Sequence, residues 1–330
     1  MKAIIPLAGL GKRLRPHTHT KPKPLVHVAG KPLLGHLLDQ LLPYKIEEYV
    51  FVIGYLGEQV KEYVHQNYTI NTAFYEQTEL NGQAGAVYLA KERVKRDALI
   101  IFGDTLFDHR ETGFDALESI VEDGLLYVKE VDDPRRFGVI VTDENGRVTQ
   151  LVEKPKNPPS KLVNVGLYYI KHMEKLYASI DQLMARQNEG ELYLLDAFGI
   201  LLSQGLQFTT RPIKSWLDCG TRESLLETNR VLLSERTQMD GEMQNSCIIP
   251  PVFIDKGARI IHSVIGPYVS VGNNVEIVDS RITNSIINPY ARVHKTIIED
   301  TIIGERASVM LNSSQLDVGD DCQIGFYKDI

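Results

Sequence analysis

The feature that most constrains the fold is an aliphatic residue that recurs every six positions near the end of the chain. Four such rows occur, often with glycine directly behind them: Ile248, Ile254 and Ile260; Ile265, Val271 and Ile277; Ile287 and Val293; Ile303 and Val309. This period is typical of a hexapeptide β-helix, in which each face of a triangular coil buries one aliphatic residue. The period is interrupted near residues 259–265 and 279–287, so we expect an imperfect helix of about four or five coils. Ordinary antiparallel strands are the alternative.

The earlier part of the chain alternates apolar, strand-length runs with amphipathic ones. Residues 2–8, 49–53 and 99–102 indicate strands, and the leucines of residues 33–42 recur at helical spacing. Strand followed by helix is typical of a mixed, mostly parallel Rossmann-like sheet covered by helices, the α/β class. Residues 124–170 are strand-rich, with Asn145-Gly146 as a hairpin turn. Because 330 residues exceed one ordinary core, we expect this domain over 1–236, a polar linker at 237–245 and the β-helix over 246–330.

Composition limits the classes of protein that are compatible with the chain. Hydrophobic residues make up 43% and charged residues 24%, a globular balance that excludes an intrinsically disordered chain. The net charge of −7 makes nucleic acid an unexpected partner, and no apolar run approaches the ~20 residues of a membrane span. Three cysteines are too few for a disulfide framework, and the N-terminus does not resemble a cleavable signal. We expect a cytoplasmic protein.

The first 31 residues are basic, with seven lysines and arginines and no acidic residue. A glycine turn, Gly9-Leu10-Gly11, follows the first strand, but Leu14 replaces the third glycine of a dinucleotide-binding loop. A Walker loop is excluded as well, because Gly11-Lys12 is followed by Arg13 rather than Ser or Thr. What remains is a turn whose backbone N–H groups, with Arg13 and Lys23, can wrap a triphosphate.

Further motifs give this loop a specific resemblance. Residues 7–16 and 21–25 resemble the signature loop of the sugar-1-phosphate nucleotidyltransferases. Other motifs follow in the family's order: Gly103-Asp104, Phe137-Gly138-Val139, Glu153-Lys154-Pro155, Asn164-Val165-Gly166, Gly190-Glu191 with Asp196, and residues 216–221. Residues 223–232 resemble the long type of glucose-1-phosphate thymidylyltransferase, which carries a C-terminal left-handed β-helix. The resemblance covers essentially the whole chain.

The resemblance implies transfer of a nucleotidyl group from a nucleoside triphosphate, with dTTP favoured, to a sugar 1-phosphate, with glucose 1-phosphate favoured. It assigns Arg13 to the triphosphate, Lys23 to the reacting centre, and Asp104 and Asp218 to Mg²⁺, as catalytic residues. The nucleotide-binding residues it implies are Leu7, Gly9, Gly11, Lys12, Gln77, Gly82 and Gly85. The sugar-phosphate-binding residues are Gly138, Glu153, Lys154, Asn164 and Glu191. Gln77 could equally be a polar surface residue.

Several alternatives stay open. Lys12 stands where the family usually has Thr, so the enzyme could instead prefer uridine or another base. A catalytically silent regulatory homologue would lack Arg13, Lys23, Asp104 or Asp218, and all four are present. A hexapeptide-repeat acyltransferase is the third possibility. We favour an assembly role for the β-helix, as the contact region of a homo-oligomer. Since every expected chemical residue precedes it, removing the β-helix should spare the active site.

Overall fold

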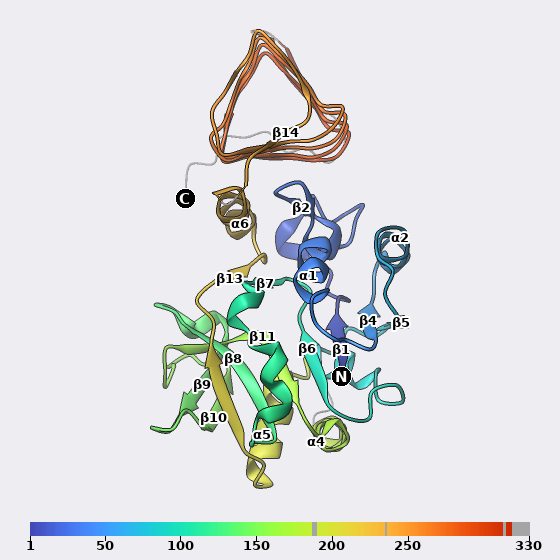
Figure 1. Cartoon of the computed structure of the whole chain (residues 1–330), viewed down its shortest axis with the longest axis vertical. Coiled ribbons are helices and arrows are strands. Elements are labelled where there is room, and N and C mark those ends of the chain that lie inside the picture. Colours follow the sequence, from blue (N-terminus) through green and yellow to red (C-terminus); the bar gives the residue numbers. More distant parts are fainter. Residues whose placement is uncertain (187–189, 235, 313–314, 319–330) are drawn as a thin grey trace. The chain divides into compact units, whose positions relative to one another are not determined.

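The computed structural model describes residues 1–186, 190–234, 236–312 and 315–318. The chain forms two compact units, and Figure 1 shows their elements. The first unit comprises Met1–Leu10 and His36–Leu217, and the second comprises Gly11–Gly35 and Asp218–Ile330. Residues 11–35, which begin at the last glycine of the N-terminal glycine turn, therefore group with the C-terminal part of the chain, a long-range association that has no signature in the local sequence.

The first unit is built on a nine-stranded sheet in the order β10-β9-β11-β6-β1-β4-β5, with β8 pairing both β11 and β12. Its strands are β1 (Lys2–Pro6), β4 (Tyr49–Ile53), β5 (Thr72–Glu76), β6 (Ala98–Ile101), β8 (Gly124–Glu130), β9 (Gly138–Thr142), β10 (Val148–Glu153), β11 (Leu162–Ile170) and β12 (Phe208–Pro212). A separate two-stranded sheet pairs β7 (Thr105–Phe107) with β13 (Trp216–Asp218).

The two halves of the large sheet differ in direction. In the parallel half, Ile4 of β1 lies opposite both Val50 of β4 and Ile100 of β6. These strands are buried along almost their whole length, as parallel strands covered on both faces are. In the other half, β11 runs antiparallel to β6, β8 and β9, and the Asn145-Gly146 turn joins β9 to β10. The mixed, mostly parallel sheet and the hairpin expected from the sequence are both confirmed.

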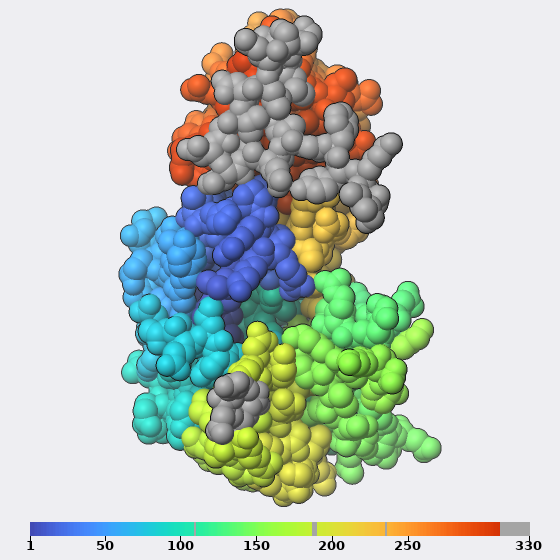
Figure 2. Space-filling view, turned by 180° about the vertical axis from the view of Figure 1, so that it is seen from behind, coloured from blue at the N-terminus to red at the C-terminus, as the bar shows by residue number. Residues whose placement is uncertain are grey.

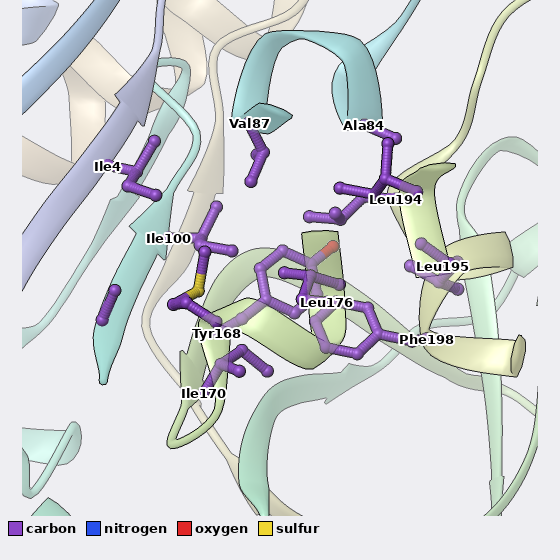
Figure 3. Close-up of a cluster of buried hydrophobic side chains, with 14 of the residues drawn as sticks. Ile4, Ala84, Val87, Ile100, Tyr168, Ile170, Leu176, Leu194, Leu195 and Phe198 are labelled. Atoms are coloured by element: carbon purple, nitrogen blue, oxygen red, sulfur yellow. The ribbon is translucent and has the colours of Figure 1, made fainter. Parts of the chain in front are cut away.

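Helices complete the first unit. They are α1 (Leu33–Leu41, which begins in the second unit), α2 (Gly57–Asn67), α3 (Gln83–Tyr88), α4 (Met173–Arg186) and α5 (Leu194–Ser203), with 3₁₀ turns η3 (His109–Glu111), η4 (Phe114–Ser119) and η5 (Pro134–Arg136). Figure 3 shows their core with the sheet: Leu176 of α4 and Phe198 of α5 lie around Tyr168 of β11, beside Ile100. The rings of Tyr168 and Phe198 stack with centroids 5.3 Å apart. This core fixes α5 against the strands that carry the expected sugar-binding residues.

The second unit contains the left-handed parallel β-helix, which Figure 1 shows as a triangular coil in orange and red. One of its faces is β14 (Gln238–Met239), β17 (Val252–Ile254), β20 (Val269–Val271), β23 (Ile286–Ile287) and β26 (Ile302–Ile303). A second is β15 (Glu242–Gln244), β18 (Arg259–Ile261), β21 (Glu276–Val278), β24 (Arg292–His294), β27 (Ser308–Asn312) and β28 (Gln315–Val318), the last antiparallel. The third is β16 (Cys247–Ile248), β19 (Val264–Ile265), β22 (Arg281–Thr283) and β25 (Ile297–Glu299).

The aliphatic rows form the core of the β-helix, as the six-residue period predicted. Nearly all of their members are buried, and Ile248 is partly buried. The coils also explain why the period is interrupted. Three perfect hexapeptides would need 18 residues a coil, whereas Cys247 pairs with Val264, 17 positions on, and Ser270 pairs with Ile286, 16 positions on. These coils are therefore one or two residues short, and the register of the rows shifts accordingly.

The β-helix begins earlier than the sequence indicates. Gln238 already pairs with Phe253, and Glu242 with Arg259, so the expected linker at 237–245 forms the first strands of the coil. All three residues of β15 are exposed, and this polar surface at the first coil conceals the repeat in the sequence. The remaining elements of the second unit are η1 (Lys12–Leu14), η2 (Lys23–Leu25), β2 (His27–Val28), β3 (Lys31–Pro32) and α6 (Arg222–Ser234).

Candidate active site

Three of the residues expected to bind the sugar lie together in the first unit. Gly138 begins β9 opposite Glu153, the last residue of β10, and Asn164 lies on the neighbouring strand β11. A Cβ atom placed on Gly138 would lie 2.8 Å from Asn164 Nδ2 and 2.9 Å from Glu153 Oε2. The α-carbon of Gly138 thus packs directly against both polar groups, and a larger residue there would overlap them.

The orientation of the Asn164 side chain is fixed by its own strand. Its Oδ1 accepts hydrogen bonds from the Gly166 N–H (2.7 Å) and from the Tyr168 hydroxyl (2.5 Å). Tyr168 is fully buried in the core, so it holds the amide rigidly. With both donors on the oxygen, the Nδ2 group is turned toward Gly138 and is the donor that this cluster presents.

Glu153 contributes a buried carboxylate to this cluster. Its side chain is 9% exposed, and Oε2 is buried with no hydrogen-bond partner among the described residues. Burial raises the pKa of Glu153; Lys154, whose Nζ lies 3.5 Å from Oε1, lowers it by charge and hydrogen bonding, while Asp196 and Glu191 raise it further. An unsatisfied buried acceptor costs about 1–3 kcal/mol. The carboxylate is therefore poised to accept a hydroxyl donor.

Lys154 follows β10 and presents its charge at the edge of the same cluster. Its backbone is left-handed (φ 43°), and its N–H donates to the Phe137 carbonyl at 3.1 Å. Its Nζ lies 4.6 Å from the centroid of the Tyr193 ring. The side chain is nevertheless 47% exposed. The ammonium group is positioned by a carboxylate and an aromatic face while remaining accessible to an anion.

Gln77, Gly82 and Gly85 belong to one compact turn before and within α3. Gln77 is 8% exposed, and its Nε2 donates to Asn81 Oδ1 (2.9 Å) and to the Gly82 carbonyl (3.1 Å). Gly82 has φ +104° and lies against the backbone of Leu192, and Gly85 lies against the Asn81 side chain. Gln77 is therefore a buried residue that shapes this turn, and the alternative that it is a surface residue is wrong.

The segment from Glu191 to Leu195 contacts both groups of expected residues. The Leu192 N–H donates to the Asn81 carbonyl (2.8 Å), and the Leu192 carbonyl accepts from the Ala84 N–H (3.0 Å). Tyr193 lies under Lys154, and Leu195 lies beside Gly138. Glu191 itself is exposed at the start of the segment. Sequence reasoning missed Leu192, Tyr193 and Leu195, because their partners are distant in the sequence and no local pattern marks the contact.

Three further expected residues lie at the carboxyl ends of β1 and β6. Leu7 is buried, and its N–H donates to the Val52 carbonyl at 2.7 Å. Gly103 donates to the Pro6 carbonyl (3.3 Å) and has no room for a side chain beside Leu7, which brings the half-buried Asp104 to this edge. Gly9 is exposed, with no atom within 4 Å of where its Cβ would be. Ligands of parallel sheets bind at such strand ends.

The remaining expected residues lie in the second unit. Gly11 adopts φ +60°, and its α-carbon lies against Lys23 and against Thr18, which also donates from its hydroxyl to the Gly11 carbonyl at 3.0 Å. The glycine turn and Lys23 are thus packed together, with Lys12 and Arg13 exposed.

Arg13 and Asp218 lie at Gly220. A Cβ placed there would be 3.0 Å from both Arg13 Nη2 and Asp218 Oδ1. Cys219, between Asp218 and Gly220, is buried with its Sγ 3.4 Å from Thr228 Oγ1. It is accordingly a packing residue.

The chemistry of the donor set fits a hard cation. Asp104 and Asp218, the residues expected to bind Mg²⁺, each carry carboxylate oxygens, and Mg²⁺ is usually held by one or two carboxylates together with substrate phosphates. The part of the chain that the structure describes holds no cluster of three or more His, Cys, Asp or Glu side chains suited to a metal.

Among the described residues, no helix has the length and apolar character needed to cross a membrane.

Comparisons with known proteins place the chain in a family. Residues 2–235 match the nucleotidyl transferase family model. The bifunctional protein GlmU of Methanocaldococcus jannaschii is 31% identical, covering 95% of this chain and 80% of that protein. A Streptomyces antibioticus glucose-1-phosphate thymidylyltransferase is 30% identical over 94% of this chain and 93% of its own length. The UTP–glucose-1-phosphate uridylyltransferase AglF of Haloferax volcanii is 32% identical over 72% and 99%. The chain therefore belongs to the nucleotidyl transferase family, as an enzyme of its sugar-1-phosphate nucleotidyltransferase group.

Proposed function

We propose that the protein transfers a nucleotidyl group from dTTP to glucose 1-phosphate, giving a nucleotide-sugar and pyrophosphate. A phosphate oxygen of the sugar 1-phosphate attacks the α-phosphorus. The bond from the α-phosphorus to the bridging oxygen breaks, and pyrophosphate leaves with the bonding electron pair. No group on the protein becomes covalently attached, so catalysis consists of positioning and charge neutralisation.

The observation that carries this proposal is the group formed by Gly138, Glu153 and Asn164. Glu153 Oε2 is a buried acceptor without a partner among the described residues, and Asn164 Nδ2 is a donor turned toward the same glycine. A sugar presents hydroxyl groups that both donate and accept, so one sugar hydroxyl can satisfy the carboxylate while another accepts from the amide. Lys154, accessible beside them, supplies the charge that the phosphate of the sugar 1-phosphate needs.

The triphosphate is assigned to the basic turn, the segment from Gly9 to Lys23. Arg13 binds the phosphates, Lys23 acts near the reacting centre, and the backbone N–H groups of the turn at Gly9 and Gly11 add partial positive charge. Asp104 and Asp218 hold Mg²⁺, which when bound neutralises phosphate charge. Support for this assignment comes from the residue type, because Mg²⁺ is usually held by one or two carboxylates together with substrate phosphates.

The base is assigned to the turn that contains Gln77, Gly82 and Gly85. Its glycines permit the close contacts with Leu192 and Asn81 that shape the turn, and Leu192 anchors it to the segment next to the residues assigned to the sugar. The choice of dTTP rests on the similarity to the Streptomyces enzyme along nearly the whole chain. A preference for UTP is the alternative, favoured by the similarity to AglF over its full length.

A pyrophosphate-release assay tests the proposal. Purified protein is mixed with Mg²⁺ and each of dTTP, UTP, GTP, CTP and ATP, crossed with glucose, galactose, mannose and N-acetylglucosamine 1-phosphates. The expected result is the highest kcat/KM for dTTP with glucose 1-phosphate. A higher value for another pair would replace the substrate assignment, and no release with any pair would favour the catalytically silent homologue.

We further propose that the β-helix makes a homo-oligomer. Apolar side chains on its surface support this: Met243 and Ile249 are each 40% exposed, and Ile297 is 80% exposed. Exposed aliphatic groups of this kind are favourable contact points between copies of a chain. Sedimentation of the wild-type protein and of an Ile297→Lys variant tests this proposal. The variant should sediment as a smaller particle than the wild-type protein. Particles of equal size would contradict the proposal.

A further inference from the structure

The basic turn of the second unit is attached to the last described coils of the β-helix by an ion pair. Lys21, two residues before Lys23, donates from Nζ to Glu305 Oε2 at 2.7 Å, across 284 positions of sequence. The two side chains are only 15% and 26% exposed. A partly buried pair is screened less than a surface pair, so its geometry holds more firmly.

The surroundings of the pair strengthen it. Burial on its own would raise the pKa of Glu305, but the hydrogen bond and charge of Lys21, with Arg306 and His27, lower it overall. Glu305 is therefore charged at neutral pH. His17, on the same turn, has its pKa lowered to about 4 by burial and by the charges of Lys21 and Arg222, so it is neutral there. Glu305 is the carboxylate that forms the ion pair with Lys21.

A second attachment joins Ala29, eight residues after Lys21, to Asn229 on α6. Asn229 is fully buried, and its Oδ1 accepts from the Ala29 N–H (2.9 Å) and from the Ser270 hydroxyl (2.5 Å). Its Nδ2 donates to the Tyr268 carbonyl (3.2 Å). One side chain thus ties the segment that follows the basic turn to a coil of the β-helix.

Packing and a third hydrogen bond complete the contact. Gly30 lies so close to the Phe253 ring that a Cβ would overlap it. Arg222, at the start of α6, donates from Nη1 to the Asp300 carbonyl at 2.7 Å. Figure 2 shows the N-terminal segment in dark blue at the surface next to the β-helix. The segment that carries Arg13 and Lys23 is therefore held by the coil at Lys21 and, beyond Lys23, at Ala29 and Gly30.

We propose that Glu305 is a positioning residue for nucleotidyl transfer, which acts through Lys21 to hold the basic turn in its working place. This inference rests on the proposed function of that turn. It replaces the expectation that removing the β-helix spares the active site. A chain cut after Gln244 would lose Glu305. It would also lose the carbonyl groups of Tyr268 and Asp300, which accept hydrogen bonds from α6. The β-helix then serves the reaction as well as the assembly of the protein.

Kinetics of Glu305→Gln test the proposal, with Glu276→Gln as the matched control. Glu276 also lies on the β-helix beside charged partners, with Arg259 at 3.5 Å and His294 at 2.9 Å, and none of them belongs to the Lys21 pair. Displacing a catalytic group by about 1 Å can cost about 100-fold, so we expect kcat/KM for the triphosphate to fall about 10- to 100-fold in Glu305→Gln. The KM for sugar 1-phosphate should stay within about twofold, a split that general loss of structure would not produce.

A charge reversal separates positioning from mere loss of a carboxylate. The double variant Lys21→Glu with Glu305→Lys restores the pair in the opposite sense and should recover most of the lost kcat/KM. Equal effects of Glu305→Gln and Glu276→Gln, an unchanged Glu305→Gln, or a double variant no better than the single one would each overturn the proposal.

Hydrogen exchange gives a readout that does not depend on substrate. Amides of residues 11–25 should exchange faster in Glu305→Gln than in wild-type protein, and at the wild-type rate in Glu276→Gln. If the wild-type protein released no pyrophosphate with any substrate pair, the proposed function would fail, and the exchange data alone would decide whether Glu305 holds the turn. Unchanged exchange in Glu305→Gln would overturn that attachment.

Discussion

Replacing Gly138 with alanine tests the arrangement of Gly138, Glu153 and Asn164 that the proposal assigns to the sugar. The added methyl group would lie 2.7 Å from Leu195 Cδ2, 2.8 Å from Asn164 Nδ2 and 2.9 Å from Glu153 Oε2. Carbon contacts are normally about 3.5–4.0 Å, so all three neighbours must move. They belong to three different elements, and Leu195 is 1% exposed, so no single flexible side chain can relieve the overlap. We expect a loss of about 1–3 kcal/mol in the free energy of unfolding.

The same methyl group should impair sugar binding selectively. It displaces the amide of Asn164 and the carboxylate of Glu153, which the proposal assigns to sugar hydroxyls. Losing one hydrogen bond worth about 1.5 kcal/mol raises a dissociation constant about tenfold. The KM for sugar 1-phosphate should therefore rise at least about tenfold, with the KM for the triphosphate nearly unchanged.

Gly199→Ala provides the control. Gly199 lies inside α5, and a Cβ there would have no atom within 4 Å. Removing a glycine from a helix interior should stabilise the protein by about 0.5–1 kcal/mol, with no kinetic effect. Trp216 is the single tryptophan, and its ring lies 5.4 Å from that of Phe137, so its fluorescence during urea unfolding reports on this region. A Gly138→Ala variant with the wild-type midpoint and wild-type KM would refute the reasoning.

The other predictions concern charged residues. Asp104→Asn and Asp218→Asn should each lower kcat about 100-fold at saturating Mg²⁺, because phosphate charge is left uncompensated; near-normal rates would contradict the metal assignment. Lys154→Ala should raise the KM for sugar 1-phosphate about tenfold, whereas Lys23→Ala should depress kcat, and equal effects of the two on triphosphate KM would contradict this division. Since burial raises the folded pKa of Glu153 above 4.5, ionisation destabilises the native state, and the stability advantage of Glu153→Gln should grow as the pH rises from about 4.5 through that pKa. Urea midpoints at several pH values measure it, and a constant difference would show that Glu153 is not desolvated.

Elements with a local signature were predictable from the sequence. The aliphatic rows predicted the β-helix because a six-residue period survives in the chain even where the coils have 16 or 17 residues. Asn145-Gly146 predicted the hairpin because a tight turn needs the left-handed backbone that Gly146 adopts. The first coil was missed, since residues 237–245 are mostly polar, lie largely at the surface and resemble a linker.

The residues assigned to the sugar could be predicted only in part. Resemblance named Gly138, Glu153 and Asn164 one by one, but their convergence depends on the pairing of β9 with β10 and on the place of β11. Their electrostatics depend on it as well. The raised pKa of Glu153 comes from burial among groups far away in the sequence, and residue type alone does not carry it.

The sequence by itself determined the two kinds of architecture and the family, because periodicity and short motifs are properties of consecutive residues. Contacts between the expected site residues and distant parts of the chain depended on the tertiary structure. Tyr193 under Lys154 and Glu305 against Lys21 are such pairs, 39 and 284 positions apart. A contact of that kind depends on where the whole chain places two side chains, and neither partner's neighbours in the sequence encode it.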